Sequence, residues 1–131
     1  MRKRVFPFAR ALTVSGVGLA LLLGASVSAN AHHGWGWYGG EPFELTGTVE
    51  EINLGGPHGQ LKVRADGQLW DVVLAPPGRN ARAGLTEAAQ IGIGTEITAR
   101  GHRWKDGPRL EIKTERLVVG DRTFNLYPNR D

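Results

Sequence analysis

From position 43 onward, apolar and polar residues alternate in short runs separated by turn residues, and this pattern limits the fold more than any other feature. Such alternation is typical of strands with one face in a core and the other in water. The runs cover residues 43–52, 61–65, 70–74, 95–104, 110–119 and 123–126. Asp66-Gly67, between the second and third runs, is a two-residue hairpin signal of the type I′ kind. The pattern therefore predicts a mainly β domain.

One break between the runs differs from a simple turn. Pro76-Pro77-Gly78 ends the third run, and Asn80 to Leu85 predicts one or two helical turns with Asn80 as the N-cap. Three strands, a short helix and two long strands is the order of an OB-like barrel, in which closure removes exposed sheet edges. We predict a small OB-like barrel of five to six strands with one short helix between strands 3 and 4. An open β-sandwich or meander is the alternative.

Residues 1–31 have the three parts of an export signal. Four basic residues lie within positions 2–10, an apolar run covers positions 11–23, and Ala29 and Ala31 form an A-x-A cleavage site. The apolar run is shorter than the ~20 residues that a membrane helix needs. We expect cleavage after Ala31, a periplasmic or secreted bacterial protein, and no transmembrane segment in the mature chain. An uncleaved anchor and a cut after Ala29 are the alternatives.

Removal of the signal changes the net charge. The full chain has 16 Lys and Arg against 13 Asp and Glu, and four of the basic residues but none of the acidic ones lie in the signal. The remaining 12 basic and 13 acidic residues give a formal charge of −1, which argues against a nucleic-acid partner. The length suits one domain, residues 43–131, preceded by a flexible Gly/aromatic lead-in at 32–42.

Histidine is the residue type that suggests a transition-metal site. The chain has no cysteine and its one methionine is the initiator, so histidine, carboxylate or backbone-nitrogen ligands remain, which suit copper(II), zinc or nickel. After a cut behind Ala31, His32 would offer its α-amine and its imidazole to one metal ion. A second imidazole would complete the three-nitrogen set called a histidine brace. His58, on a Gly/Pro loop, is the best candidate for it, and His33 and His102 are the other two histidines.

Each histidine also has an ordinary interpretation. His32 and His33 can belong to a solvated tail, His58 to a surface loop, and His102 to the polar face of a strand. A cut after Ala29 would instead leave Asn30-Ala31-His32, an X-X-His terminus. Such a terminus binds copper(II) or nickel(II) through amine, amide and imidazole nitrogens.

Aromatic residues form a second candidate site. Trp35, Trp37 and Tyr38 lie in the Gly-rich lead-in, and Trp104 lies close to a turn. One interpretation is that these rings pack over one end of the barrel, because each ring buries a large area. The other is a stacking surface for a sugar or another flat ligand.

Several short motifs occur together along the chain. They are the His-His pair, the strand Leu45-Thr46-Gly47-Thr48-Val49, the loop Gly56-Pro57-His58, the helical turn from Pro77 to Gly84, and the Lys-Asp-Gly turn within Gly101 to Gly107. In this combination the chain resembles a family of small exported bacterial proteins of unknown function. Gly56 and Gly59-Gln60 depart from the family's usual Asn and Ala-aromatic residues. The resemblance implies a periplasmic location and an OB-like barrel, and it implies no particular activity.

The sequence favours a binding protein over an enzyme. Neither G-x-S-x-G nor H-E-x-x-H occurs, and the neighbours Glu50 and Glu51 would point to opposite faces of a strand. We expect a small periplasmic protein that binds a metal ion, copper(II), through His32 and His58. The alternative is a metal-independent ligand- or protein-binding barrel that uses exposed aromatics. A histidine-brace copper enzyme is a third hypothesis, for which the short chain leaves little room.

Overall fold

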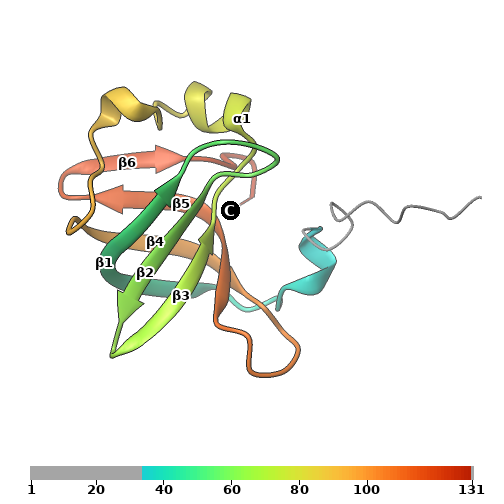
Figure 1. The fold of residues 1–131 in the computed structure, drawn as a ribbon. Helices are drawn as coiled ribbons and strands as arrows, with labels where there is room; N and C mark the ends of the chain where they lie inside the picture. The colour runs from blue at the N-terminus through green and yellow to red at the C-terminus, as the bar shows by residue number, and fades with distance from the viewer. Residues whose placement is uncertain (1–33, 131) are drawn as a thin grey trace, which may run out of the picture.

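The computed structural model describes residues 34–130, so the predicted signal and both His32 and His33 lie outside the described part (Figure 1). The strands are β1 (Phe43–Asn53), β2 (Gln60–Ala65), β3 (Gln68–Val73), β4 (Glu96–Arg103), β5 (Glu111–Val119) and β6 (Arg122–Asn125). The helical segments are the 3-10 turn η2 (Trp35–Trp37), the helix α1 (Pro77–Arg82) and the 3-10 turn η3 (Glu87–Ala89). Within residues 34–130, no helix has the length and apolar character needed to span a membrane.

The strands form a closed barrel. Along the sheet their order is β3-β2-β1-β4-β5-β6, and a parallel pairing of β3 with β5 joins the first five strands into a ring. That pairing runs from Asp71 opposite Glu111 to Val73 opposite Lys113. β6 is an additional strand that pairs with β5. The predicted OB-like barrel, with its short helix between β3 and β4, is therefore confirmed.

The alternating pattern produces the core directly. On β1, for example, Leu45 is 6 % exposed and Val49 is fully buried, whereas Thr46 and Thr48 between them are exposed. The hairpin between β2 and β3 has positive φ at both Asp66 and Gly67, which the predicted type I′ turn requires. The remaining core comes from aliphatic and aromatic residues of every strand and of the segment after α1.

The start of α1 differs from the prediction. The helix begins at Pro77, with no side-chain cap, because a proline in the first turn has its φ preset for the helix and needs no hydrogen-bond partner for nitrogen. Asn80 is buried inside α1 instead. Its side-chain oxygen accepts from the Ala75 backbone nitrogen at 3.0 Å, and its side-chain nitrogen donates to the Ala75 carbonyl at 2.7 Å. Asn80 thus anchors α1 to the segment that follows β3.

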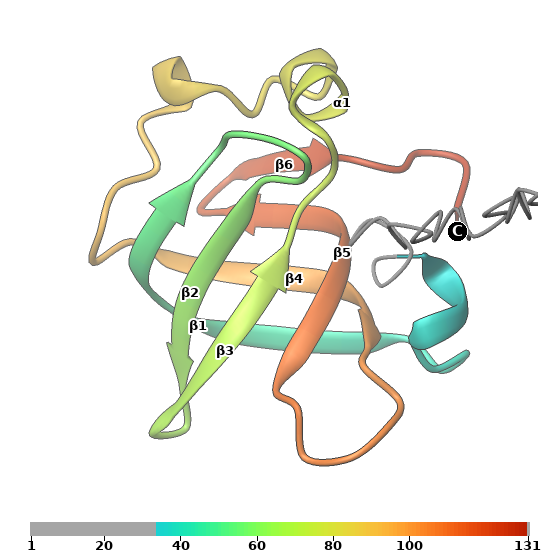
Figure 2. The same cartoon turned by 45° about the vertical axis from the view of Figure 1, so that its right-hand side comes forward.

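The two ends of the barrel are different. α1 and η3 lie across one end, together with the loop between β1 and β2, and the β2–β3 hairpin projects at the other end (Figures 1 and 2). The β1–β2 loop is held by backbone hydrogen bonds from Gly59 to Ala75 and from Leu74 to Gly59. His58 belongs to this loop and is half-buried.

Candidate functional site

The described part of the lead-in pairs with the chain that follows β4. Residues 35–37 form one 3-10 turn, and Tyr38 then makes an antiparallel bridge to Trp104 beyond the end of β4. The backbone nitrogen of Gly39 donates to the Arg103 carbonyl at 2.9 Å. Tyr38 is 5 % exposed. Within the segment predicted to be a flexible lead-in, Tyr38 and Gly39 are therefore held against the barrel, whereas residues 40–42 are exposed.

The four aromatic side chains predicted as a candidate site do come together. Trp35 meets Tyr38 edge-on with 6.4 Å between centroids. The rings of Trp37 and Trp104 stack at 5.6 Å between centroids, and Tyr38 meets Trp104 edge-on at 5.6 Å. The Arg109 guanidinium lies 4.4 Å from the centre of the Trp104 ring. These rings mainly pack against one another and against a cation. A stacking surface for an external ligand would therefore have to use Trp37, which is 38 % exposed.

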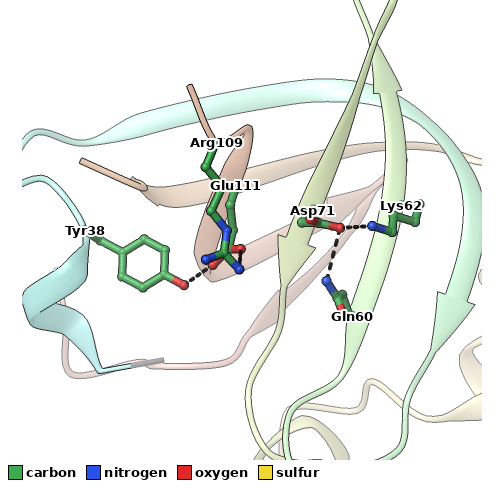
Figure 3. Close-up of polar contacts among 6 residues, drawn as sticks. All are labelled: Tyr38, Gln60, Lys62, Asp71, Arg109 and Glu111. Carbon is green, nitrogen blue, oxygen red and sulfur yellow. Dashed lines mark hydrogen bonds and ion pairs between the residues drawn. The ribbon is translucent and has the colours of Figure 1, made fainter. Parts of the chain in front are cut away.

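Tyr38 also belongs to a polar cluster at the start of β5, and Figure 3 shows its contacts with Glu111 beside Arg109. The Tyr38 hydroxyl donates a hydrogen bond to one carboxylate oxygen of Glu111, and Arg109 contacts the other oxygen at 2.7 Å. Glu111 is 1 % exposed and Lys113 is 2 % exposed. The Lys113 ammonium lies 5.0 Å from the centre of the Trp35 ring. The polar face of β5 is thus covered by the lead-in, and the buried carboxylate is compensated by a hydrogen bond and a cation.

Burial shifts the pKa of several groups in this region. It raises the pKa of Tyr38 far above its ordinary value, and the hydrogen bond to Glu111 raises it further. Burial also raises the pKa of Tyr127, although the cations Arg79 and Arg130 oppose this. For Lys113, burial is the main cause of a lowered pKa. The neutral form of each group is favoured because the charged form loses hydration.

The two tyrosines of the chain should resist ionisation in the folded protein. Because their folded pKa values exceed the unfolded ones, the stability they contribute is complete below about pH 10 and is lost as the pH rises toward the folded values. In an alkaline titration, we expect tyrosinate absorbance to appear together with the loss of circular dichroism. The urea-unfolded chain, as a control, should titrate near pH 10. Tyrosinate formation near that pH in a protein of unchanged dichroism would contradict the burial.

His102 lies on β4, and each nitrogen of its imidazole ring contacts an oxygen atom of another residue. Its Nδ1 is 2.8 Å from the Gly39 carbonyl oxygen, and its Nε2 is 3.2 Å from Oε1 of Glu115. A bulge in β5 produces the second contact, because the pairing passes from Arg116 opposite Arg100 to Thr114 opposite Gly101 and skips Glu115. β-bulges redirect side chains in this way and are frequent beside functional sites.

The surroundings of His102 come from both ends of the described chain. Trp35 lies edge-on to the imidazole with 6.0 Å between centroids. The Arg130 guanidinium lies 3.8 Å from the centre of the Trp35 ring and 3.3 Å from Glu115 Oε1. An open groove of about 830 Å³, lined in part by His102, Glu115 and Arg130, begins at this point.

His58 does not share this location. The first residue of β1, Phe43, pairs with Gly101 beside His102, whereas its last residue, Asn53, pairs with Gln60 beside the His58 loop. The two histidines therefore lie toward opposite ends of β1. Among residues 34–130 there is no cluster of three or more histidines or carboxylates able to hold a metal ion. With His32 and His33 outside these residues, the pairing of His32 with His58 stays a prediction.

The barrel, with its packed lead-in and polar cluster, defines a small OB-like β-domain. Residues 20–131 match the DUF6152 family of unknown function, and the chain belongs to that family. This confirms the resemblance noted from the motifs. No curated protein matches the sequence. A similar solved structure is that of apo TiaS, a tRNAIle2 agmatidine synthetase, with 13 % identity and a TM-score of 0.44; the match covers 60 % of this chain and 18 % of that one.

Proposed function

We propose that this protein is a small exported binding protein of the periplasm that holds copper(II) at its mature N-terminus. The α-amine and imidazole of His32 would supply two nitrogens, as the sequence suggests, and the imidazole of His102 would supply the third. The observation that carries this choice is the position of His102 next to Trp35, with its ring oriented by Gly39 and Glu115. The role proposed is binding rather than catalysis.

The contacts of His102 match those of a metal-binding histidine. Such residues commonly donate one ring N–H to a backbone carbonyl, which fixes the tautomer and leaves the other nitrogen for the metal. Here Gly39 is that carbonyl, and Nε2 faces Glu115 at 3.2 Å. Two donor atoms on one metal ion at ~2.0–2.2 Å stand about 3 Å apart, so both groups suit a shared cation. A metal ion bound between Nε2 of His102 and the Glu115 carboxylate would take the place of a proton between these two groups.

The covalent chain favours His102 over His58 as the partner of His32. His32 precedes Trp35 by three residues, and each residue advances the chain by at most about 3.8 Å. Since Trp35 contacts the His102 ring, the amine of His32 is within reach of that imidazole. His58 lies toward the other end of β1. Arg130 binds the same carboxylate oxygen as His102 and would have to exchange this contact for one with the bound metal.

Substitution of the two histidines separates the hypotheses. For protein expressed with its own signal, and shown by intact mass to begin at His32, we expect His102→Ala to lower the copper(II) affinity by at least about tenfold. His58→Ala is the matched control and should leave the affinity unchanged. Calorimetric titration against a competing chelator measures both. A loss in His58→Ala alone would favour the His32–His58 brace, and no loss in either variant would indicate a site confined to the tail.

A further inference from the structure

A second hollow lies at the end of the barrel that α1 and η3 cover. Figure 2 shows these two elements across that end. We call it the η3 pocket. It has a volume of about 280 Å³. Its walls are mainly aliphatic, and these side chains are Ile52, Leu54, Leu61, Leu85, Ile91 and Leu117. Thr86 and Glu87, where η3 begins, supply its polar groups.

The η3 pocket arises because the segment after α1 covers the barrel end incompletely. Leu61, Leu85 and Leu117 are almost fully buried and belong to the core, whereas Ile52 and Ile91 are only partly buried. The pocket therefore reaches from solvent to the core of the barrel. Its volume is about twice that of an engineered ~150 Å³ aliphatic cavity that binds benzene. A hollow of this kind suits a molecule of roughly ten non-hydrogen atoms.

The charge of the residues that line the pocket indicates which polar end group a bound molecule would carry. A neighbouring hollow of about 500 Å³ runs along α1 and shares five residues with the η3 pocket, which are Ile52, Leu54, Leu85, Thr86 and Glu87. In the described chain, Glu87 is the one charged residue that lines either hollow. Arg122 contacts η3 through the Ala89 carbonyl and lines neither. An acidic rim on an aliphatic pocket attracts a cationic end group and repels an anionic one.

We propose that the η3 pocket binds a small apolar amine, with its hydrocarbon part among the six aliphatic side chains and its ammonium group at Glu87. The ligand class differs from the metal proposed for His102, and the residues involved do not overlap. The copper hypothesis and this one can therefore fail separately.

Three probes of similar size test the proposal: phenethylamine, phenethyl alcohol and phenylacetate. Each is titrated into the mature protein while amide NMR shifts are recorded. We expect phenethylamine to bind most tightly, the alcohol more weakly and phenylacetate most weakly, with the largest shifts in residues 52–54 and 85–91. Glu87→Gln should weaken phenethylamine about two- to fivefold, as for an exposed ion pair, and leave the alcohol unaffected. Glu96→Gln, an exposed acidic residue outside the pocket, is the matched control and should change neither.

Filling the pocket tests its location. Leu54→Trp is expected to abolish binding of the amine and of the alcohol, and Ile91→Trp provides the same test if the first variant does not fold. Binding that persists in a folded filled variant would overturn the assignment of the site. Phenylacetate binding as tightly as phenethylamine would overturn the ligand class. The proposal would also be wrong if none of the three probes shifted the pocket amides.

Discussion

Gly101→Ala is expected to lower the free energy of unfolding by about 3 kcal/mol or more, or to prevent folding altogether. A Cβ atom at this position would stand 1.9 Å from the carbonyl oxygen of Lys113 and 3.0 Å from Cα of Thr114. Both atoms belong to the backbone of β5, which also pairs with β3 to close the barrel. The strain cannot be relieved by rotating a side chain, so β4 and β5 would have to separate.

A glycine in open surroundings provides the control for this experiment. Gly78 lies in α1, and a Cβ there would meet no atom within 4 Å. Gly78→Ala should raise the free energy of unfolding by about 0.5–1 kcal/mol, because alanine favours the helix. Urea unfolding followed by circular dichroism measures both variants. Equal stability of Gly101→Ala and the unsubstituted protein would show that β4 and β5 do not approach as closely as described.

Much of the fold follows from local pattern. The six alternating runs correspond to β1–β6 with bounds that differ by at most two residues, because burial of one face forces period-two spacing. The Asp66-Gly67 turn was also predictable, since few dipeptides tolerate two positive φ angles. The start of α1 was harder to predict from the sequence. Asparagine is a common N-cap residue, yet the Asn80 side chain forms hydrogen bonds with the backbone of Ala75.

The candidate site depends on contacts that no local pattern contains. Glu111 and Lys113 have the alternation of a solvated strand face, and they are covered by Trp35 and Tyr38, which come more than seventy residues earlier in the chain. Glu115 reaches His102 because a bulge skips one residue of β5. The four aromatic residues and His102 could be recognised as candidates from the sequence, whereas Glu111, Glu115 and Arg130 could not. The contact of Glu115 with His102 depends on the bulge in β5, and a bulge leaves no periodic pattern in the sequence.

A blocked N-terminus should have the largest effect on copper binding. If His32 chelates through its α-amine, a Gly-Ser-Gly-Ser extension before it removes that nitrogen from the residue. We expect the copper(II) affinity to fall by more than the ~10–100-fold that follows when a metal ligand loses its hydrogen-bond partner. An extension of one or two residues is unsuitable, because it would place His33 or His32 third from the terminus and create an X-X-His site. The same extension after Asp131 is the control and should have no effect.

The most direct test of the copper hypothesis is electron paramagnetic resonance of the mature protein titrated with copper(II), with and without this N-terminal extension. We expect one bound copper per chain with hyperfine coupling to several nitrogens, and we expect that spectrum to be lost in the extended protein and in His102→Ala. An unchanged spectrum and affinity in the extended protein would contradict copper binding through the α-amine of His32.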